Sequence, residues 1–154
     1  MVILIVVHLN ISVYTHCMQT IPINTYNSPT IISELIMRLK IKDVMTRSLI
    51  SVPMGTTMRE VQKLMREKRI TGVPVVDNKR LLGIVSMDDI IQALDFGYIE
   101  EKVEDHMSSN LILLDEDMPI SFAIKYFDRY RYHRFPVLNK EKELAGIVTT
   151  RDII

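Results

Sequence analysis

The chain has 154 residues, 47% of them hydrophobic, which suits one compact domain or two small ones that share a core. Lysine and arginine number 19, as do aspartate and glutamate, so the formal net charge is zero. This balance gives no electrostatic reason for non-specific binding to nucleic acid or to an acidic membrane surface. The single cysteine, Cys17, cannot form an internal disulfide and is typical of a reduced thiol in a cytoplasmic protein.

Residues 1–40 are predicted to form an N-terminal arm or extension. The apolar run from Val2 to Val7 is too short for a transmembrane helix, which needs about 20 apolar residues. The start also lacks the positive charge of a signal peptide, and its β-branched residues favour a strand or an irregular arm. Three interpretations of residues 1–36 stay open: a packing arm, a dimerisation arm, or a start assigned too early, with Met37 as a natural start.

An internal repeat organises the rest of the chain. Three blocks occur twice in the same order, with one residue inserted near Glu143 in the second copy. The first copy reads KDVMT from Lys42, GVPVVD from Gly72 and LGIVSMDDII from Leu82; the second reads EDHMS from Glu104, RFPVLN from Arg134 and AGIVTTRDII from Ala145. Ile154 falls early in the last helix expected of the second copy.

The first copy predicts the order strand, helix, strand, strand, helix. A short strand at 49–52 and a turn at 53–57 precede a helix, for which Thr57 and Glu60 form a capping box. Strands at 73–76 and 81–85 flank a polar hairpin turn at 77–80, and a second helix starts near Ser86. The apolar residues of the first helix share one face at helical spacing and are expected in the core: Met58, Val61, Leu64 and Met65.

The second copy predicts the same order, with a strand at 111–114, a turn at 115–119 and strands around Val137 and Ile147. Its first helix is expected to bury one face made of Phe122, Ala123, Tyr126 and Phe127. The acidic run at 115–117 could serve acid–base chemistry or bind a cation. It more readily precedes a helix N-terminus, where negative charge is favourable and Pro119 fits the first turn.

A unit of about 50 residues buries little surface by itself. Two copies in tandem therefore predict two sheets packed face to face about a pseudo-twofold axis. Such symmetry produces clefts in equivalent pairs, and clefts between packed units are where small ligands usually bind.

These blocks resemble the cystathionine-β-synthase (CBS) pair, or Bateman, family over residues 41–154. The resemblance implies an α/β (α+β) fold of two tandem βαββα repeats, CBS repeat 1 at 41–95 and CBS repeat 2 at 102–154. It also implies no catalysis, adenosyl ligands in the clefts, association as flat dimers, and a partner or attached domain that responds to the bound state. The second copy departs from the first at Arg134, where the first has Gly72.

Two motifs at strand-to-helix junctions have both a structural and a functional interpretation. Ser86 with Asp89, and Thr149 with Asp152, fit capping boxes. Glutamate would cap equally well, whereas an aspartate can also accept from both hydroxyls of a ribose. In CBS families the matching aspartate binds ribose and the matching hydroxyl assists.

His133 and Arg134 precede a strand, and the arginine offers a fork of donors that fits phosphate oxygens. The pair is similar to one in the nucleotide-sensing γ subunit of AMP-activated protein kinase, where those positions contact phosphate. The alternative is a solvated basic surface at a helix end.

The resemblance implies two sites. The first, which binds the nucleotide, comprises Thr46, Ile70, Thr71, His133, Arg134, Ile147, Thr149 and Asp152, with Ile70 and Thr71 receiving the adenine. The second and weaker site comprises Ser86, Asp89, Ser108 and Tyr132. There Thr71 and Gly72 replace the His-Arg pair, so the second site is empty, binds a nucleoside-like ligand, or has decayed.

The sequence thus predicts a non-catalytic cytoplasmic module that binds AMP, ADP or ATP, with S-adenosylmethionine as a further possibility, and signals to an unknown protein by a population shift. It predicts a homodimer with no required cofactor, no metal and no membrane association. One alternative is a ligand-free dimerisation scaffold. Another is a single-stranded nucleic-acid surface on the basic and aromatic run 129–135. An enzyme is disfavoured because the sequence has no glycine-rich phosphate loop, metal cluster or activated nucleophile.

Overall fold

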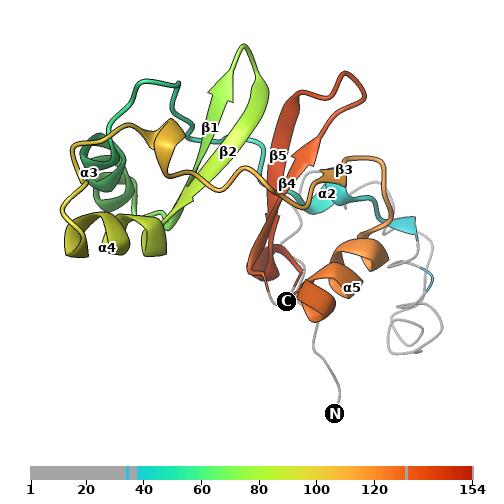
Figure 1. Ribbon diagram of the computed structural model, residues 1–154. Coiled ribbons are helices and arrows are strands. Elements are labelled where there is room, and N and C mark those ends of the chain that lie inside the picture. Colours follow the sequence, from blue (N-terminus) through green and yellow to red (C-terminus); the bar gives the residue numbers. More distant parts are fainter. Residues whose placement is uncertain (1–33, 35–37, 131, 154) are drawn as a thin grey trace. The chain divides into compact units, whose positions relative to one another are not determined.

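The computed structural model describes residues 34, 38–130 and 132–153, and these form two compact units (Figure 1). Unit 1 comprises the described residues of 1–47 together with 113–141 and 145–154, and unit 2 comprises 48–112 and 142–144. The predicted arm at 1–36 and Cys17 lie outside the described residues, apart from Glu34. The fold is mixed α+β with small sheets, as expected for tandem repeats.

Unit 2 is built on the predicted hairpin. Strands β1 (Gly72–Asp77) and β2 (Arg80–Ser86) pair antiparallel, with Gly72 opposite Ser86. The two turn residues, Asn78 and Lys79, both have positive φ angles, which is the backbone that joins two-residue hairpins without splaying the strands. A β-bulge shifts the register between Val75 and Val76.

Helices α3 (Met58–Lys68) and α4 (Met87–Asp95) and the 3-10 helix η3 (Val103–Asp105) complete unit 2. The capping box predicted for α3 is present, because the Thr57 amide donates to the Glu60 carboxylate at 2.7 Å and the Glu60 amide donates to the Thr57 hydroxyl at 3.2 Å. The predicted apolar face of α3 lies in the core, with Leu64 partly buried beside it. The core residues are Val52, Met58, Val61, Met65, Val73, Val75, Val85, Ile90, Ala93, Ile99 and Val103.

Unit 1 contains a three-stranded sheet in the order β3 (Leu114–Asp115), β4 (Arg134–Leu138) and β5 (Leu144–Thr149), with β3 parallel to β4. The short helix α2 (Ile41–Val44), helix α5 (Ile120–Tyr130) and the 3-10 helix η4 (Thr150–Asp152) complete it. Its buried apolar side chains include Ile41, Leu114, Ile120, Ala123, Phe135, Val137 and Val148.

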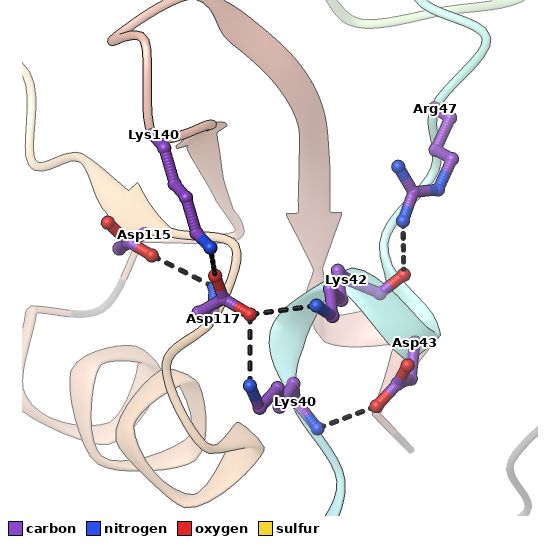
Figure 2. A network of polar contacts seen from close by, with 7 residues as sticks. All are labelled: Lys40, Lys42, Asp43, Arg47, Asp115, Asp117 and Lys140. Carbon is purple, nitrogen blue, oxygen red and sulfur yellow. Dashed lines mark hydrogen bonds and ion pairs between the residues drawn. The ribbon is translucent and has the colours of Figure 1, made fainter.

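A charged network joins α2 to the turn between β3 and α5 (Figure 2). The Asp117 carboxylate accepts from the ammonium groups of Lys40 at 3.0 Å and Lys42 at 2.8 Å, and Lys140 lies 3.8 Å away. Hydrogen bonds from Lys42 and Lys40 hold the pKa of Asp117 far below its usual range, and the same carboxylate raises the pKa of Lys42. The acidic run therefore lies before helix α5, and its last carboxylate, that of Asp117, is paired with lysines of its own unit.

Three predictions about the elements are wrong. The expected strand at 49–52 makes only a bridge, between Val52 and Val75, and the expected strand at 111–114 is reduced to Leu114 and Asp115. Only Val52, Leu114 and Asp115 lie beside a strand, so the apolar residues before them have no neighbouring strand for backbone hydrogen bonds. The predicted apolar face of α5 is wrong at Phe122, which is 46% exposed, whereas Ala123 is buried and Tyr126 and Phe127 pack against the buried Phe135.

No helix among the described residues is long and apolar enough to cross a membrane. Within the same residues there is no cluster of three or more histidine, cysteine, aspartate or glutamate side chains that could hold a metal ion.

Candidate functional site

Each unit has a strand-to-helix junction where a hydroxyl and a carboxylate are held together. In unit 1 the backbone amide and the hydroxyl of Thr149 donate to Oδ2 of Asp152 at 2.6 and 2.7 Å. In unit 2 the amide and hydroxyl of Ser86 donate to Oδ2 of Asp89, both at 2.7 Å. The capping boxes predicted from the sequence are therefore present. Both boxes use Oδ2, so Oδ1 of each half-buried carboxylate lies outside the box.

The residue before the first strand of each hairpin lies beside this junction. The Thr150 amide donates to the His133 carbonyl at 3.2 Å, and in unit 2 the Met87 amide donates to the Thr71 carbonyl at 3.1 Å. The backbone of His133 thus lies beside the short helix that carries Asp152. An arginine, an imidazole and a carboxylate near one end of a hairpin form an arrangement suited to a ligand with both hydroxyl and phosphate groups.

The start of each repeat forms a second side of each junction. The Thr46 amide donates to the Ile147 carbonyl at 2.9 Å, and the Ile147 amide donates back at 3.0 Å. Ser108 and Ile84 exchange the equivalent bonds at 2.9 and 3.0 Å in unit 2. The exposed Thr46 and Ser108 therefore lie beside the strands that lead to Thr149 and Ser86.

We call Thr46, His133, Arg134, Thr149 and Asp152 the unit-1 half-site. The equivalent unit-2 half-site comprises Thr71, Gly72, Ser86, Asp89 and Ser108. The two half-sites share their hydroxyls and carboxylates but differ in charge. His133 is exposed, and Arg134 is half-buried at the first position of β4, where burial lowers the pKa of its guanidinium. An arginine remains charged at neutral pH despite such a shift, so only the unit-1 half-site carries a fixed cation at this place.

The predicted site residues divide between the units. Of the first site, unit 1 contains Thr46, His133, Arg134, Ile147, Thr149 and Asp152, whereas Ile70 and Thr71 belong to unit 2. Of the second site, unit 2 contains Ser86, Asp89 and Ser108, and Tyr132 belongs to unit 1. The roles of all these residues in binding stay a prediction.

Sequence reasoning missed the contacts that hold the repeat starts in place. A Cβ added to Gly146 would lie 2.6 Å from the sulfur of Met45, and one added to Gly83 would lie 2.5 Å from the sulfur of Met107. Each methionine thus covers the glycine of a strand. The signal was available in the sequence, because both repeats place a methionine in the first block and a glycine in the third.

The aromatic rings of the run at 129–135 contact one another and the rings of helix α5. Phe135 is buried, and Tyr126, Phe127 and Tyr132 all lie within 6.1 Å of its ring centre. Tyr130 stacks on Tyr132 at 6.4 Å. Because these rings face one another, fewer of their faces are available to stack on bases than the sequence pattern indicates.

Comparison with known proteins identifies the family. The model of the CBS domain matches twice, at residues 41–95 and 103–154. The chain belongs to the CBS-domain family. It is 33% identical, over 116 residues, to the uncharacterized protein MJ1232 of Methanocaldococcus jannaschii, a match covering 75% of this chain and 38% of that protein. The CBS resemblance inferred from the sequence is thereby confirmed.

Solved CBS-domain pairs share the fold and have adenosyl ligands. The CBS-domain pair of protein MJ0100, in complex with 5′-methylthioadenosine and S-adenosyl-L-methionine, has a TM-score of 0.66 and 27% identity, covering 74% of this chain and 91% of that one. The structure of CBSX2 in complex with AMP has a TM-score of 0.65 and 26% identity, covering 73% of this chain and 91% of that one. The chain spans less than half the length of the curated relatives that it matches first.

Proposed function

We propose that this protein is a non-catalytic regulatory module that binds an adenine nucleotide (AMP, ADP or ATP) and signals the bound state to a partner protein as a homodimer. The supporting observation is the unit-1 half-site, where the Asp152 carboxylate, the Thr149 hydroxyl and the His133–Arg134 pair lie at one end of the β4–β5 hairpin. The ligands of two related CBS-domain pairs, AMP in one and adenosyl compounds in the other, support the same ligand class.

Each residue of the half-site has a chemical role in this proposal. Oδ1 of Asp152 accepts from the ribose hydroxyls while Oδ2 keeps the helix cap. Arg134 donates its fork of N–H groups to phosphate oxygens, and His133 adds a further donor. Ile70 and Thr71 of unit 2 are assigned to the adenine by the sequence, and that assignment stays a prediction. S-adenosylmethionine has no phosphate for Arg134 to bind, so a phosphate-bearing ligand is favoured.

The ligand acts by favouring one conformation of the module over another. It shifts that equilibrium only as far as its affinities for the two conformations differ. The responding partner is therefore a protein that contacts the module in one state more strongly than in the other.

The test is a thermal-shift series with AMP, ADP, ATP, S-adenosylmethionine and GTP on the full chain and two matched variants. Asp152→Ala and Asp89→Ala each remove one capping carboxylate, so both should lower the melting temperature of the free protein by similar amounts. A ligand at a hundred times its Kd adds about 2.7 kcal/mol to the folded state. Adenine nucleotides should stabilise the wild type and Asp89→Ala but not Asp152→Ala. No shift with any ligand would favour the ligand-free scaffold instead.

A further inference from the structure

Met107 packs the starting segment of the second repeat (residues 103–108) against strand β2. Its side chain is partly buried against the core of unit 2, and a Cβ added to Gly83 would lie 2.5 Å from its sulfur and 2.7 Å from its Cγ. The next residue, Ser108, exchanges two backbone hydrogen bonds with Ile84, and these form an isolated bridge rather than a longer ladder. Because the bridge is so short, the packing of Met107 on Gly83 helps to hold Ser108 in the unit-2 half-site.

The equivalent methionine of the first repeat makes the same contact but is less accessible to water. Met45 covers Gly146 in unit 1, where an added Cβ would lie 2.6 Å from the methionine sulfur. Met45 is buried, with 7% of its surface exposed, whereas Met107 is only partly buried. The two methionines therefore hold equivalent segments by equivalent contacts, and they differ in how easily a small solute reaches them.

A methionine thioether that a solute can reach is open to oxidation by a peroxide. The sulfur lone pair attacks one oxygen of hydrogen peroxide, the S–O bond forms as the O–O bond breaks, and the second oxygen leaves as water. The sulfur loses two electrons, and the peroxide gains them. The product, methionine sulfoxide, is a polar side chain in the place of an apolar one.

The sulfoxide is incompatible with the contact that Met107 makes. An oxygen that points towards β2 has no room, because the place above Gly83 cannot hold even a methyl group beside the methionine. An oxygen that points to water draws the side chain off the strand, since a polar group is unfavourable in an apolar contact unless it is hydrogen-bonded. In both cases the bonds between Ser108 and Ile84 lose the side chain that covers them.

We propose that Met107 is an oxidation site, at which a peroxide converts the thioether to the sulfoxide and thereby releases the starting segment of the second repeat from β2. Ser108 then leaves the unit-2 half-site. Unit 1 keeps its half-site, because Met45 is buried. This inference goes beyond the proposed function and does not depend on which ligand binds.

The test treats the full chain with hydrogen peroxide and follows two measurements over time. Every sample carries Cys17→Ser, so that the thiol does not react. Peptide mass spectrometry measures the oxidised fraction of each methionine, and Met107 should be oxidised well before Met45. Amide hydrogen exchange, measured by NMR, should become about tenfold faster or more at Ser108 and Ile84 as Met107 is oxidised. The equivalent amides of unit 1, those of Thr46 and Ile147, should keep their protection.

Three variants separate the role of this sulfur from general damage. Met107→Leu keeps a similar apolar volume without the thioether and should keep its protection in peroxide. Met54→Leu removes a methionine that is 52% exposed and should lose protection at Ser108 as the parent chain does. Met107→Gln introduces a polar side chain and should show the faster exchange without peroxide, while circular dichroism shows an intact fold.

Two results would overturn the proposal whatever the nucleotide series gives. One is a Met107 that stays reduced while Met54 is fully oxidised. The other is an oxidised Met107 with unchanged exchange at Ser108, or an equal loss of protection in Met107→Leu.

Discussion

Thr46 and Ile147 bond to each other through both of their backbone amides, although they belong to different sequence repeats. Ser108 and Ile84 do the same in unit 2. Each compact unit therefore contains the hairpin of one repeat and the starting segment of the other. One consequence is that a single repeat expressed alone would lack the segment that covers the glycine of its own second hairpin strand.

Gly146 and Gly83 each lie against the starting segment of the other repeat, and we expect both to resist substitution. In Gly146→Ala the new Cβ would lie 2.9 Å from the Thr46 carbonyl oxygen as well as close to Met45. The methionine side chain can rotate away, but the carbonyl is fixed by its bond with the strand. We expect a loss of about 1–3 kcal/mol in the free energy of unfolding, measured by urea titration.

Gly83→Ala is the internal comparison, because its Cβ would meet Ser108 at the same 2.9 Å. The two substitutions should cost similar amounts, since the two contacts repeat the same geometry. Losses below about 0.5 kcal/mol in both variants would mean that the starting segments move away from the new methyl group at little cost, contrary to the packing seen in each unit.

The sequence predicts local structure in this chain better than it predicts which strands pair and which helix side is buried. Both hairpins, the Thr57 cap and the buried face of α3 follow from turn residues, capping residues and helical spacing, all of which act within a few positions. The strand expected at 49–52 was wrong because a strand needs a neighbour, and only Val52 has one. The burial expected of Phe122 was wrong because the core-facing side of α5 passes through Ile120 and Ala123.

The cap of helix α3 provides a second prediction. Thr57→Ala removes the hydroxyl that accepts from the Glu60 amide, and we expect a loss of about 1 kcal/mol in the free energy of unfolding. Thr57→Ser keeps the hydroxyl and should lose little. Equal losses in the two variants, measured by urea titration, would mean that the threonine methyl group and not the cap stabilises this end of α3.

Phosphate recognition provides a third prediction, which assumes the proposed nucleotide site. Arg134→Gln should weaken AMP binding by about ten- to a hundredfold, the range expected for a hydrogen bond to a charged group, and should leave adenosine binding nearly unchanged. Isothermal titration calorimetry with both ligands measures the ratio. Arg66→Gln, which removes an exposed cation from α3, is the control and should keep the preference for AMP. A parallel loss for AMP and adenosine would place Arg134 outside the phosphate contact.

The two capping boxes of the candidate site were predictable from the sequence, and the arrangement around them was only partly so. Thr149 with Asp152 and His133 with Arg134 could be recognised from spacing and residue chemistry. Their proximity could not, because it depends on the Thr150 amide bonding to the His133 carbonyl across the hairpin. The position of Thr46 beside Ile147 could not be predicted either, because it depends on a long-range contact between the start of the first repeat and the hairpin of the second.

The network around Asp117 predicts how stability depends on pH. Hydrogen bonds from Lys42 and Lys40 lower the pKa of this carboxyl in the folded chain. A carboxyl with a lowered folded pKa stabilises the protein above its unfolded pKa of about 3.9, and this contribution is lost as the pH falls through the folded value. Asp117→Asn should therefore be less stable than the wild type at pH 7, and the difference should shrink progressively below about pH 4.

Urea titrations at several pH values measure this difference. Asp128→Asn removes an exposed carboxylate on α5 that lies outside the network, and its stability should follow that of the wild type across the same range. A constant difference in the free energy of unfolding between Asp117→Asn and the wild type from pH 7 to pH 3 would contradict the prediction, because it would mean that the carboxylate acts through shape and not through charge.

The pH dependence of the Lys42 contribution runs the opposite way. Its raised pKa means that its stabilising contribution is present below an unfolded pKa of about 10.4 and is lost as the pH rises through the folded pKa. The network should therefore weaken at both acidic and strongly alkaline pH and stabilise unit 1 between them.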